Sequence, residues 1–238
     1  MLRAVLFDMD GTLLDHESAS AAAGEDFVRR LRPDLPVAEA VSLWTDDDRN
    51  GYDLFLAGEL TFQQRRRYAV RGLAPPLAEA SDDEVDAVFE TYLADYRSRW
   101  RPYDDARPAL AAVLDLGLRV AIVSNNSWDQ TREKAEVVGL SPEVAPIVAS
   151  ESVGAPKPDP RIFVAACEAV GSRPEETLMV GDDLRGDVLG ALGAGLRAAW
   201  LRRPAATGGA VPADGPAPGA TYATMHTLAA LSRVLGRG

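Results

Sequence analysis

The chain has 238 residues, of which 47% are hydrophobic and 26% charged, and its formal net charge is -11. This composition is typical of a soluble globular protein, and the length suits a core domain with a smaller second domain. The excess of negative charge argues against nucleic acid and anionic membranes as partners, although a metal ion and a few local cations would still admit an anionic substrate.

The N-terminal residues do not have the pattern of a secretion signal. They contain no basic segment followed by a long apolar stretch, and no segment of the chain reaches the ~20 apolar residues that a membrane-spanning helix needs. Cys167 is the one cysteine, so no intrachain disulfide can form, which fits a reducing compartment. We therefore expect a cytoplasmic protein.

The first predicted strand covers residues 2–7, an unbroken apolar run that is typical of a strand buried on both faces. Two carboxylates, Asp8 and Asp10, follow at once and lead into Gly11-Thr12. Residues two apart on an extended chain point the same way, so both carboxylates can face one site, where their repulsion calls for a cation such as Mg2+. One could attack phosphorus and the other could transfer protons. The structural alternative is an acidic turn at a strand end.

Residues 16–100 have a different character. Apolar spacing predicts helices at 20–31, 37–44, 51–56, 61–72 and 82–100. Ser81 and Glu84 have the spacing of a capping box at the start of the last of these helices. Because this segment shows no strand pattern, we expect an all-helical insert between the first strand and the rest of a sheet domain.

From residue 101 onward, predicted strands and helices alternate. Strands are expected at 118–124, 145–149, 177–180 and 196–201, and helices at 105–116, 128–138, 160–170 and 184–194. Such alternation indicates a parallel sheet with right-handed crossovers. Residues 150–158 are predicted to be a loop and residues 204–220, rich in Pro, Gly and Ala, a flexible surface loop; residues 221–235 should form a short turn and a final amphipathic helix.

Two further predicted strands also end in polar groups, and a loop carries a lysine. Ser124-Asn125 follows one strand, where a hydroxyl and backbone N–H groups could bind phosphoryl oxygens, although a helix-capping turn would look the same. Lys157 lies between two prolines, where it could balance carboxylates and hold a phosphoryl group, or be a solvated loop residue. The carboxyl ends of parallel strands share one edge of the sheet, so these groups could meet there.

The last acidic group is Gly181-Asp182-Asp183, which follows the predicted strand 177–180, together with Asp187. These carboxylates could supply oxygen ligands to the same metal ion. The alternative is an acidic first turn of a helix, which the helix dipole favours by itself.

Taken in order, these four groups resemble the motifs of the haloacid dehalogenase-like hydrolase superfamily, and especially its phosphatase members. The resemblance covers residues 1–15 and 101–201. It implies an α/β fold with a Rossmann-like parallel sheet core, residues 1–15 and 101–238, and an inserted helical cap domain, residues 16–100. It also implies a Mg2+-dependent phosphatase that acts on a small phosphorylated metabolite. The sequence leaves open whether the protein is a monomer or a homodimer, and its negative charge argues against nucleic acid and membrane partners.

The resemblance assigns roles to residues by position. Asp8 would be the nucleophile and a metal ligand, and Asp10 the general acid and base, with its backbone carbonyl on the metal. Asp182 would be a direct ligand and Asp187 a ligand, directly or through a water molecule, or a support for Lys157; Asp183 is open between these roles. The residues implied for phosphoryl binding are Thr12, Ser124, Asn125 and Lys157. One departure is Asn126, which stands where many members have glycine.

Three other functions stay open from the sequence. A phosphomutase would use the same motifs but needs its phosphorylated aspartate shielded from water. A 2-haloacid dehalogenase is disfavoured, because those members of the superfamily lack the second aspartate, whereas Asp10 is present here. A non-catalytic binding protein is disfavoured by the intact carboxylates and by Lys157.

Overall fold

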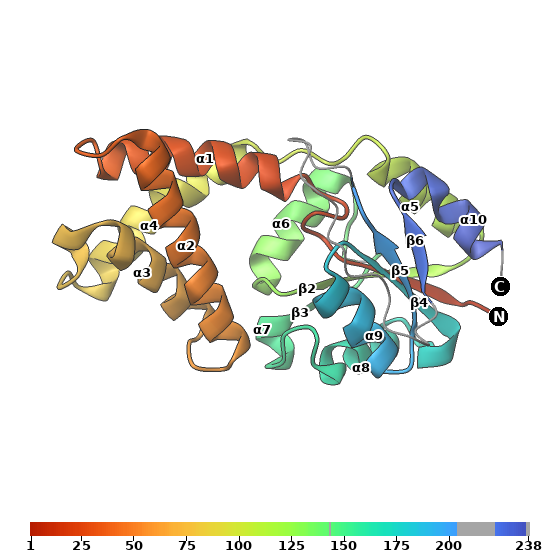
Figure 1. The fold of residues 1–238 in the computed structure, drawn as a ribbon. Coiled ribbons are helices and arrows are strands. Elements are labelled where there is room, and N and C mark those ends of the chain that lie inside the picture. Colours follow the sequence, from red (N-terminus) through yellow and green to blue (C-terminus); the bar gives the residue numbers. More distant parts are fainter. Residues whose placement is uncertain (143, 204–221, 237–238) are drawn as a thin grey trace. The chain divides into compact units, whose positions relative to one another are not determined.

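The computed structural model describes residues 1–142, 144–203 and 222–236. The chain divides into two compact units, one of Met1–Asp15 with Arg101–Gly238 and one of His16–Trp100 (Figure 1). Among the described residues, no helix is both long enough and apolar enough to cross a membrane.

The first unit is built on a six-stranded sheet with the order β3-β2-β1-β4-β5-β6, and every pairing is parallel (Figure 1). The strands are β1 (Ala4–Phe7), β2 (Arg119–Ser124), β3 (Ile147–Ala149), β4 (Thr177–Gly181), β5 (Arg197–Leu201) and β6 (Ala223–Met225). The central strand β1 is fully buried, as its uninterrupted apolar run predicts. The predicted α/β fold with a Rossmann-like core is therefore confirmed.

Helices cover both faces of this sheet. They are α5 (Ala106–Asp115), α6 (Trp128–Val138), α7 (Ser150–Val153), α8 (Pro160–Ala169), α9 (Gly190–Gly193) and α10 (Leu231–Leu235), with the 3₁₀-helices η2 (Pro174–Glu176) and η4 (Leu228–Ala230) and the π-helix η3 (Leu184–Leu189). One core lies between the sheet and α8, where Phe163 packs with Leu6 and Met179. Helix α5 buries Leu110 and Val113 and contacts β2 and α10. This packing fixes the strands whose ends carry the polar groups.

In the first unit, three details differ from the sequence prediction. Strand β6 was expected to be part of a turn, because three residues are too few to show an alternating pattern; pairing with β5 makes it a strand. The predicted loop 150–158 begins with the short helix α7. The predicted helix 184–194 is helical, but it begins as a π-helix, η3, in which Val188 N–H donates to the Asp183 carbonyl five residues back, and continues as the α-helix α9. The predicted surface loop 204–220 lies outside the described residues.

The second unit, all of whose residues are described, contains only helices: α1 (His16–Leu31), α2 (Val37–Leu56), α3 (Phe62–Leu73), η1 (Pro75–Leu77) and α4 (Asp82–Ser98). The two helices predicted at 37–44 and 51–56 are one, because the polar residues between them include no helix breaker and continue the exposed face. The capping box is confirmed: Ser81 Oγ accepts from Glu84 N–H, and Glu84 Oε2 accepts from Ser81 N–H.

Aromatic residues form the core of this helical unit. Trp44 is 6% exposed, and its ring lies 5.1 Å from Phe27 and 5.2 Å from Tyr92, measured between ring centroids. Phe89 extends the cluster. These edge-on and tilted contacts are the arrangement that aromatic quadrupoles favour, so the aromatic residues of this unit serve first to hold it together.

Candidate active site

Three adjacent strands of the first unit bring their polar ends to one edge of the sheet. Phe7 at the end of β1 pairs with Ile122 in β2 and with Val180 in β4. The polar residues follow just past these pairs: Asp8 comes one residue after Phe7, Ser124 two residues after Ile122, and Asp182 two residues after Val180. The chain thus collects carboxylates and a hydroxyl where parallel sheets commonly bind ligands.

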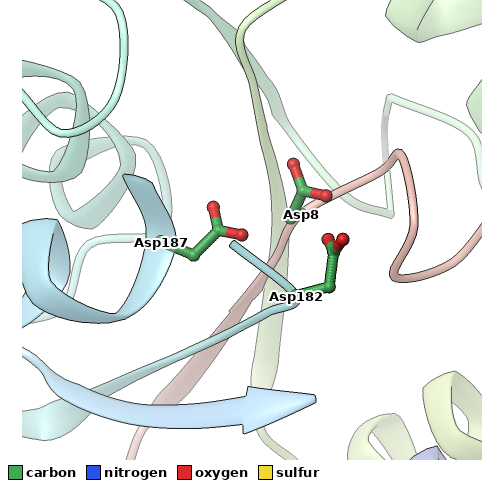
Figure 2. Close-up of side chains that lie close together, drawn as sticks. All are labelled: Asp8, Asp182 and Asp187. Atoms are coloured by element: carbon green, nitrogen blue, oxygen red, sulfur yellow. The ribbon is translucent and has the colours of Figure 1, made fainter. Parts of the chain in front are cut away.

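Three carboxylates converge at this edge: Asp8, Asp182 and Asp187 each offer an oxygen atom, and these oxygens all lie within 4.8 Å of one another (Figure 2). Two glycines make the approach possible. A Cβ atom on Gly181 would lie 2.1 Å from Asp187 Oδ2, and one on Gly11 would lie 2.3 Å from Asp182 Oδ2. Neither position could carry a side chain without displacing a carboxylate, so both glycines are part of the site.

The crowding of these acids disfavours their charged forms. Burial raises the pKa of Asp8 well above its usual range; Lys157 opposes this shift, and repulsion from Asp187 and Asp182 adds to it. Burial likewise raises the pKa of Asp187. Asp182 is exposed to solvent as a residue, but desolvation of its carboxyl group, followed by repulsion from Asp187, raises its pKa to about 7. A hard divalent cation would relieve this repulsion, and oxygen donors are what Mg2+ prefers, so the donor set fits that ion.

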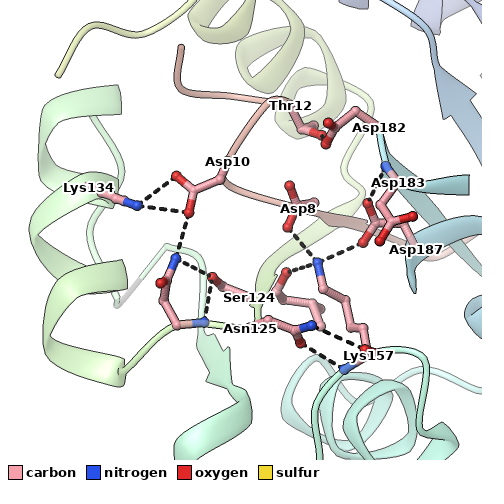
Figure 3. A network of polar contacts seen from close by, with 12 residues as sticks. Asp8, Asp10, Thr12, Ser124, Asn125, Lys134, Lys157, Asp182, Asp183 and Asp187 are labelled. Atoms are coloured by element: carbon pink, nitrogen blue, oxygen red, sulfur yellow. Dashed lines mark hydrogen bonds and ion pairs between the residues drawn. The ribbon is translucent and has the colours of Figure 1, made fainter. Parts of the chain in front are cut away.

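Lys157 supplies the positive charge of the site from the segment between α7 and α8. Its Nζ donates to Asp8 Oδ1 at 2.5 Å, to Asp187 Oδ1 at 2.6 Å and to the Val123 carbonyl at 3.1 Å (Figure 3). Burial alone would lower the pKa of this ammonium group, but the two carboxylates raise it, and the side chain stays charged. Lys157 is thus a buried cation in contact with the predicted nucleophile.

Asn125 fixes the backbone of Lys157. Its Oδ1 accepts from Lys157 N–H at 2.7 Å, and its Nδ2 donates to the Lys157 carbonyl at 3.1 Å (Figure 3). The sequence prediction placed Asn125 among the phosphoryl-binding residues. In the structure its side chain joins the end of β2 to the lysine segment, a contact between residues 32 positions apart that sequence spacing could not indicate.

Other predicted residues take part in the same network. Thr12 is fully buried and donates from Oγ1 to Asp182 Oδ1 at 3.1 Å. Ser124 is 1% exposed, and its Oγ accepts from Asn126 N–H at 3.3 Å. Asp183 caps η3 by accepting from Arg185 N–H, and its own N–H donates to Asp187 Oδ2 at 3.1 Å. Asp183 therefore orients a neighbouring carboxylate and lies outside the converging group of three.

The side chain of Asp10 turns away from this group (Figure 3). Lys134 Nζ lies 2.7 Å from Asp10 Oδ1 and 2.8 Å from Oδ2, and Asn126 Nδ2 donates to Oδ2 at 2.5 Å. Sequence reasoning missed Lys134. A signal in the sequence is that Lys134 lies four residues before the apolar Val138, so the two share one face of a helix. The structure shows that this face of α6 is buried.

Two groups behind the site support its turns. Arg203 donates to the Thr12 carbonyl at 2.9 Å, pairs with Asp105 at 2.8 Å and stacks on Tyr103, with 3.7 Å between the guanidinium carbon and the ring centroid. Trp200 Nε1–H donates to the Asp182 carbonyl at 2.9 Å. These contacts hold the turn after β1 and the turn after β4 at fixed positions.

Comparison with known proteins gives concordant matches. A model of the haloacid dehalogenase-like hydrolases matches residues 2–195. The chain is 32% identical to the phosphoserine phosphatase of Thermus thermophilus over 227 residues, which cover 85% of this chain and 89% of the relative.

Solved structures share the fold. The HAD-hydrolase YfnB of Bacillus subtilis, in a structure bound to magnesium, superposes with a TM-score of 0.77 at 23% identity and covers 99% of each chain. A 2-haloacid dehalogenase from Pseudomonas syringae pv. Tomato superposes with a TM-score of 0.68 at 24% identity, covering 100% of this chain and 99% of that one. At these identities the likeness concerns the fold alone, which phosphatases and dehalogenases have in common.

Proposed function

The chain belongs to the haloacid dehalogenase-like hydrolase family, and we propose that it is a Mg2+-dependent phosphatase that releases phosphate from a small phosphorylated metabolite through an aspartyl-phosphate on Asp8. Its curated relatives include phosphatases of phosphoserine and of phosphoglycolate. The observation that carries the proposal is the position of Asp8, which contacts the buried cation Lys157 and shares an oxygen cluster with Asp182 and Asp187.

In the proposed reaction, an oxygen of Asp8 attacks the phosphorus atom while the bond from phosphorus to the leaving oxygen breaks. Asp10 donates a proton to that leaving oxygen, so the product departs as an alcohol. Water then attacks the phosphorus of the aspartyl-phosphate and gives a proton to Asp10, which releases inorganic phosphate and restores Asp8. Lys157 and the Ser124 hydroxyl would bind the phosphoryl oxygens during both steps.

Asp8, Asp182 and Asp187 would hold the Mg2+ ion, with Asp187 bound directly or through water and the Asp10 backbone carbonyl as a further donor. When bound, the ion supplies positive charge that offsets the charge of the phosphoryl oxygens and of the crowded carboxylates. The residues of the chain do the rest: Lys157 orients Asp8, Thr12 orients Asp182, and Asp183 orients Asp187 through its N–H group.

The helical unit His16–Trp100 would act as a cap that selects the substrate. This role is proposed because the unit is inserted directly after the first motif. A hinge at each of the two connections to the first unit, near residues 15 and 101, would let the cap open and close. A phosphomutase or a non-catalytic binding protein has no observation in its favour. The dehalogenase likeness is a likeness of fold, and Asp10, which dehalogenases of this superfamily lack, is present and held in an ion pair.

The test is phosphate release from a panel of small phosphate esters, with Mg2+ and with EDTA. The proposal expects metal-dependent release by the wild-type protein and loss of release in Asp8→Asn. Asp115→Asn, an exposed position at the end of α5, serves as the matched control and should keep full activity. Release that persists both in EDTA and in Asp8→Asn would refute the proposed site.

A further inference from the structure

The site contains a second buried cation that the proposed roles do not use. The chain has two lysines, Lys134 and Lys157, and their side chains are 1% and 6% exposed. Each is paired with one of the two aspartates of the first motif: Lys157 with Asp8, and Lys134 with Asp10. A buried ammonium group loses its hydration and is tolerated only where such pairing compensates, so Lys134 is tied to Asp10.

The geometry around Asp10 is specific. Lys134 Nζ bridges both carboxylate oxygens, at 2.7 and 2.8 Å, and Asn126 Nδ2 donates to Oδ2 at 2.5 Å. Residues of two elements therefore bind the Asp10 carboxylate: Lys134 of helix α6 and Asn126 of the turn after β2. Figure 3 shows the Asp10 carboxylate turned toward Lys134 and away from Lys157 and Asp187.

We propose that Lys134, together with Asn126, is a positioning residue that fixes the Asp10 carboxylate for proton transfer at the leaving oxygen. The inference rests on the proposed phosphatase function and assigns the two buried lysines to different steps of the reaction. Lys157 serves the Asp8 side, where the phosphoryl group is transferred, and Lys134 serves the Asp10 side, where the alcohol departs. It also gives a role to Asn126, since glycine at that position would have no side-chain amide to donate to Asp10.

This assignment of the two lysines predicts a dependence on the leaving group. An alkyl phosphate needs its leaving oxygen protonated, whereas 4-nitrophenyl phosphate has a leaving group that departs readily without a proton. We expect Lys134→Met to lower kcat/KM for the best alkyl phosphate of the panel by ~10–100-fold, within the range that positioned proton transfer contributes. For 4-nitrophenyl phosphate the loss should stay under about threefold, because the Asp8 side is unchanged.

A double-mutant cycle asks whether Lys134 acts through Asp10. If it does, adding Lys134→Met to Asp10→Asn should cause no further loss with the alkyl phosphate. Arg132→Met is the matched control, because Arg132 lies on the same helix in an exposed pair with Glu136 and should leave both substrates unaffected. If Lys134→Met does not fold, Asn126→Ala, at a less buried position, makes the same comparison.

The outcomes separate this inference from the function on which it rests. Equal losses with both substrates, no loss with either, or full additivity with Asp10→Asn would overturn the positioning role while leaving the phosphatase in place. If the wild-type protein releases no phosphate from any ester in Mg2+, the proposed function fails and the positioning role fails with it.

Discussion

Replacing Gly11 by alanine should impair the proposed metal site while leaving the fold in place. Gly11 has a φ of +82°, a conformation that costs an L-residue ~1–2 kcal/mol. Its added Cβ would also meet Asp182 Oδ2 at 2.3 Å. Gly117 offers a matched control, because its φ of +71° brings the same backbone cost while a Cβ there has nothing within 4 Å.

The size of the effect follows from the displacement. Ordinary contact begins at 3.4 Å, so the Asp182 carboxylate must retreat by about 1 Å from its place beside Asp8 and Asp187. A misplacement of about 1 Å can cost ~100-fold in rate. We therefore expect Gly11→Ala to lower kcat by about that factor and to weaken Mg2+ binding at least about tenfold, or ~1.4 kcal/mol.

The assay compares both alanine variants. Mg2+ binding is measured by titration calorimetry, the free energy of unfolding by hydrogen exchange in peptides of β1 and β4, and kcat by phosphate release. Both variants should lose ~1–2 kcal/mol of stability, and only Gly11→Ala should lose metal affinity and rate. If Gly11→Ala has the same Mg2+ affinity and kcat as Gly117→Ala, the Asp182 carboxylate does not lie where the structure places it.

Two further predictions concern charge. Lys157→Met leaves two buried carboxylates without their cation and should lower the free energy of unfolding of the metal-free first unit by ~3–5 kcal/mol, measured by hydrogen exchange in urea. The control, Arg161→Met, breaks an exposed pair with Asp159 and should cost ~0–1 kcal/mol. Similar losses in the two variants would contradict the buried ion pairs of Lys157. The pKa of Asp182 is raised from its usual 3.8 to about 7 in the folded protein, so protonation of this carboxyl group stabilises the metal-free protein. That stabilisation is complete below pH 3.8 and is lost as the pH rises from 3.8 to about 7. Because a proton on Asp182 competes with Mg2+, the increase in Tm on adding Mg2+ should become larger from about pH 6 to about pH 8 in the wild type. In Asp182→Asn this increase in Tm should depend less on pH. An increase in Tm that is independent of pH in the wild type would argue against Asp182 as a ligand.

Much of the sheet could be predicted from the sequence because its central strands are buried on both faces. Residues 4–7 and 177–180 are continuous apolar runs, and each is followed at once by the polar group that marks the edge of the sheet. The exceptions are elements defined by their neighbours. Strand β6 exists through its pairing with β5, and α2 continues through a polar segment because its opposite face is buried.

The candidate site divides in the same way. Asp8, Lys157, Asp182 and Asp187 were predicted from the spacing of acids and a lysine at strand ends and on an adjacent loop, and the structure brings these side chains together. The contacts of Asp10 could not be predicted, because Lys134 lies 124 residues away on a helix, and nothing in the sequence of that helix indicates which carboxylate Lys134 contacts. Which buried cation meets which carboxylate depends on tertiary packing. Sequence spacing fixes which groups reach the edge of the sheet.

The most direct test of the central claim is whether a phosphoryl group appears on Asp8 during turnover. The protein would be mixed with the best substrate of the panel and Mg2+, quenched in acid within one turnover and analysed by peptide mass spectrometry. The account predicts a peptide around residues 4–10 that gains the mass of one phosphoryl group, and no such peptide in Asp8→Asn. A phosphoryl group on another residue would contradict Asp8 as the nucleophile. So would product formation in the first turnover with no phosphorylated peptide, provided that an acyl-phosphate survives the acid quench.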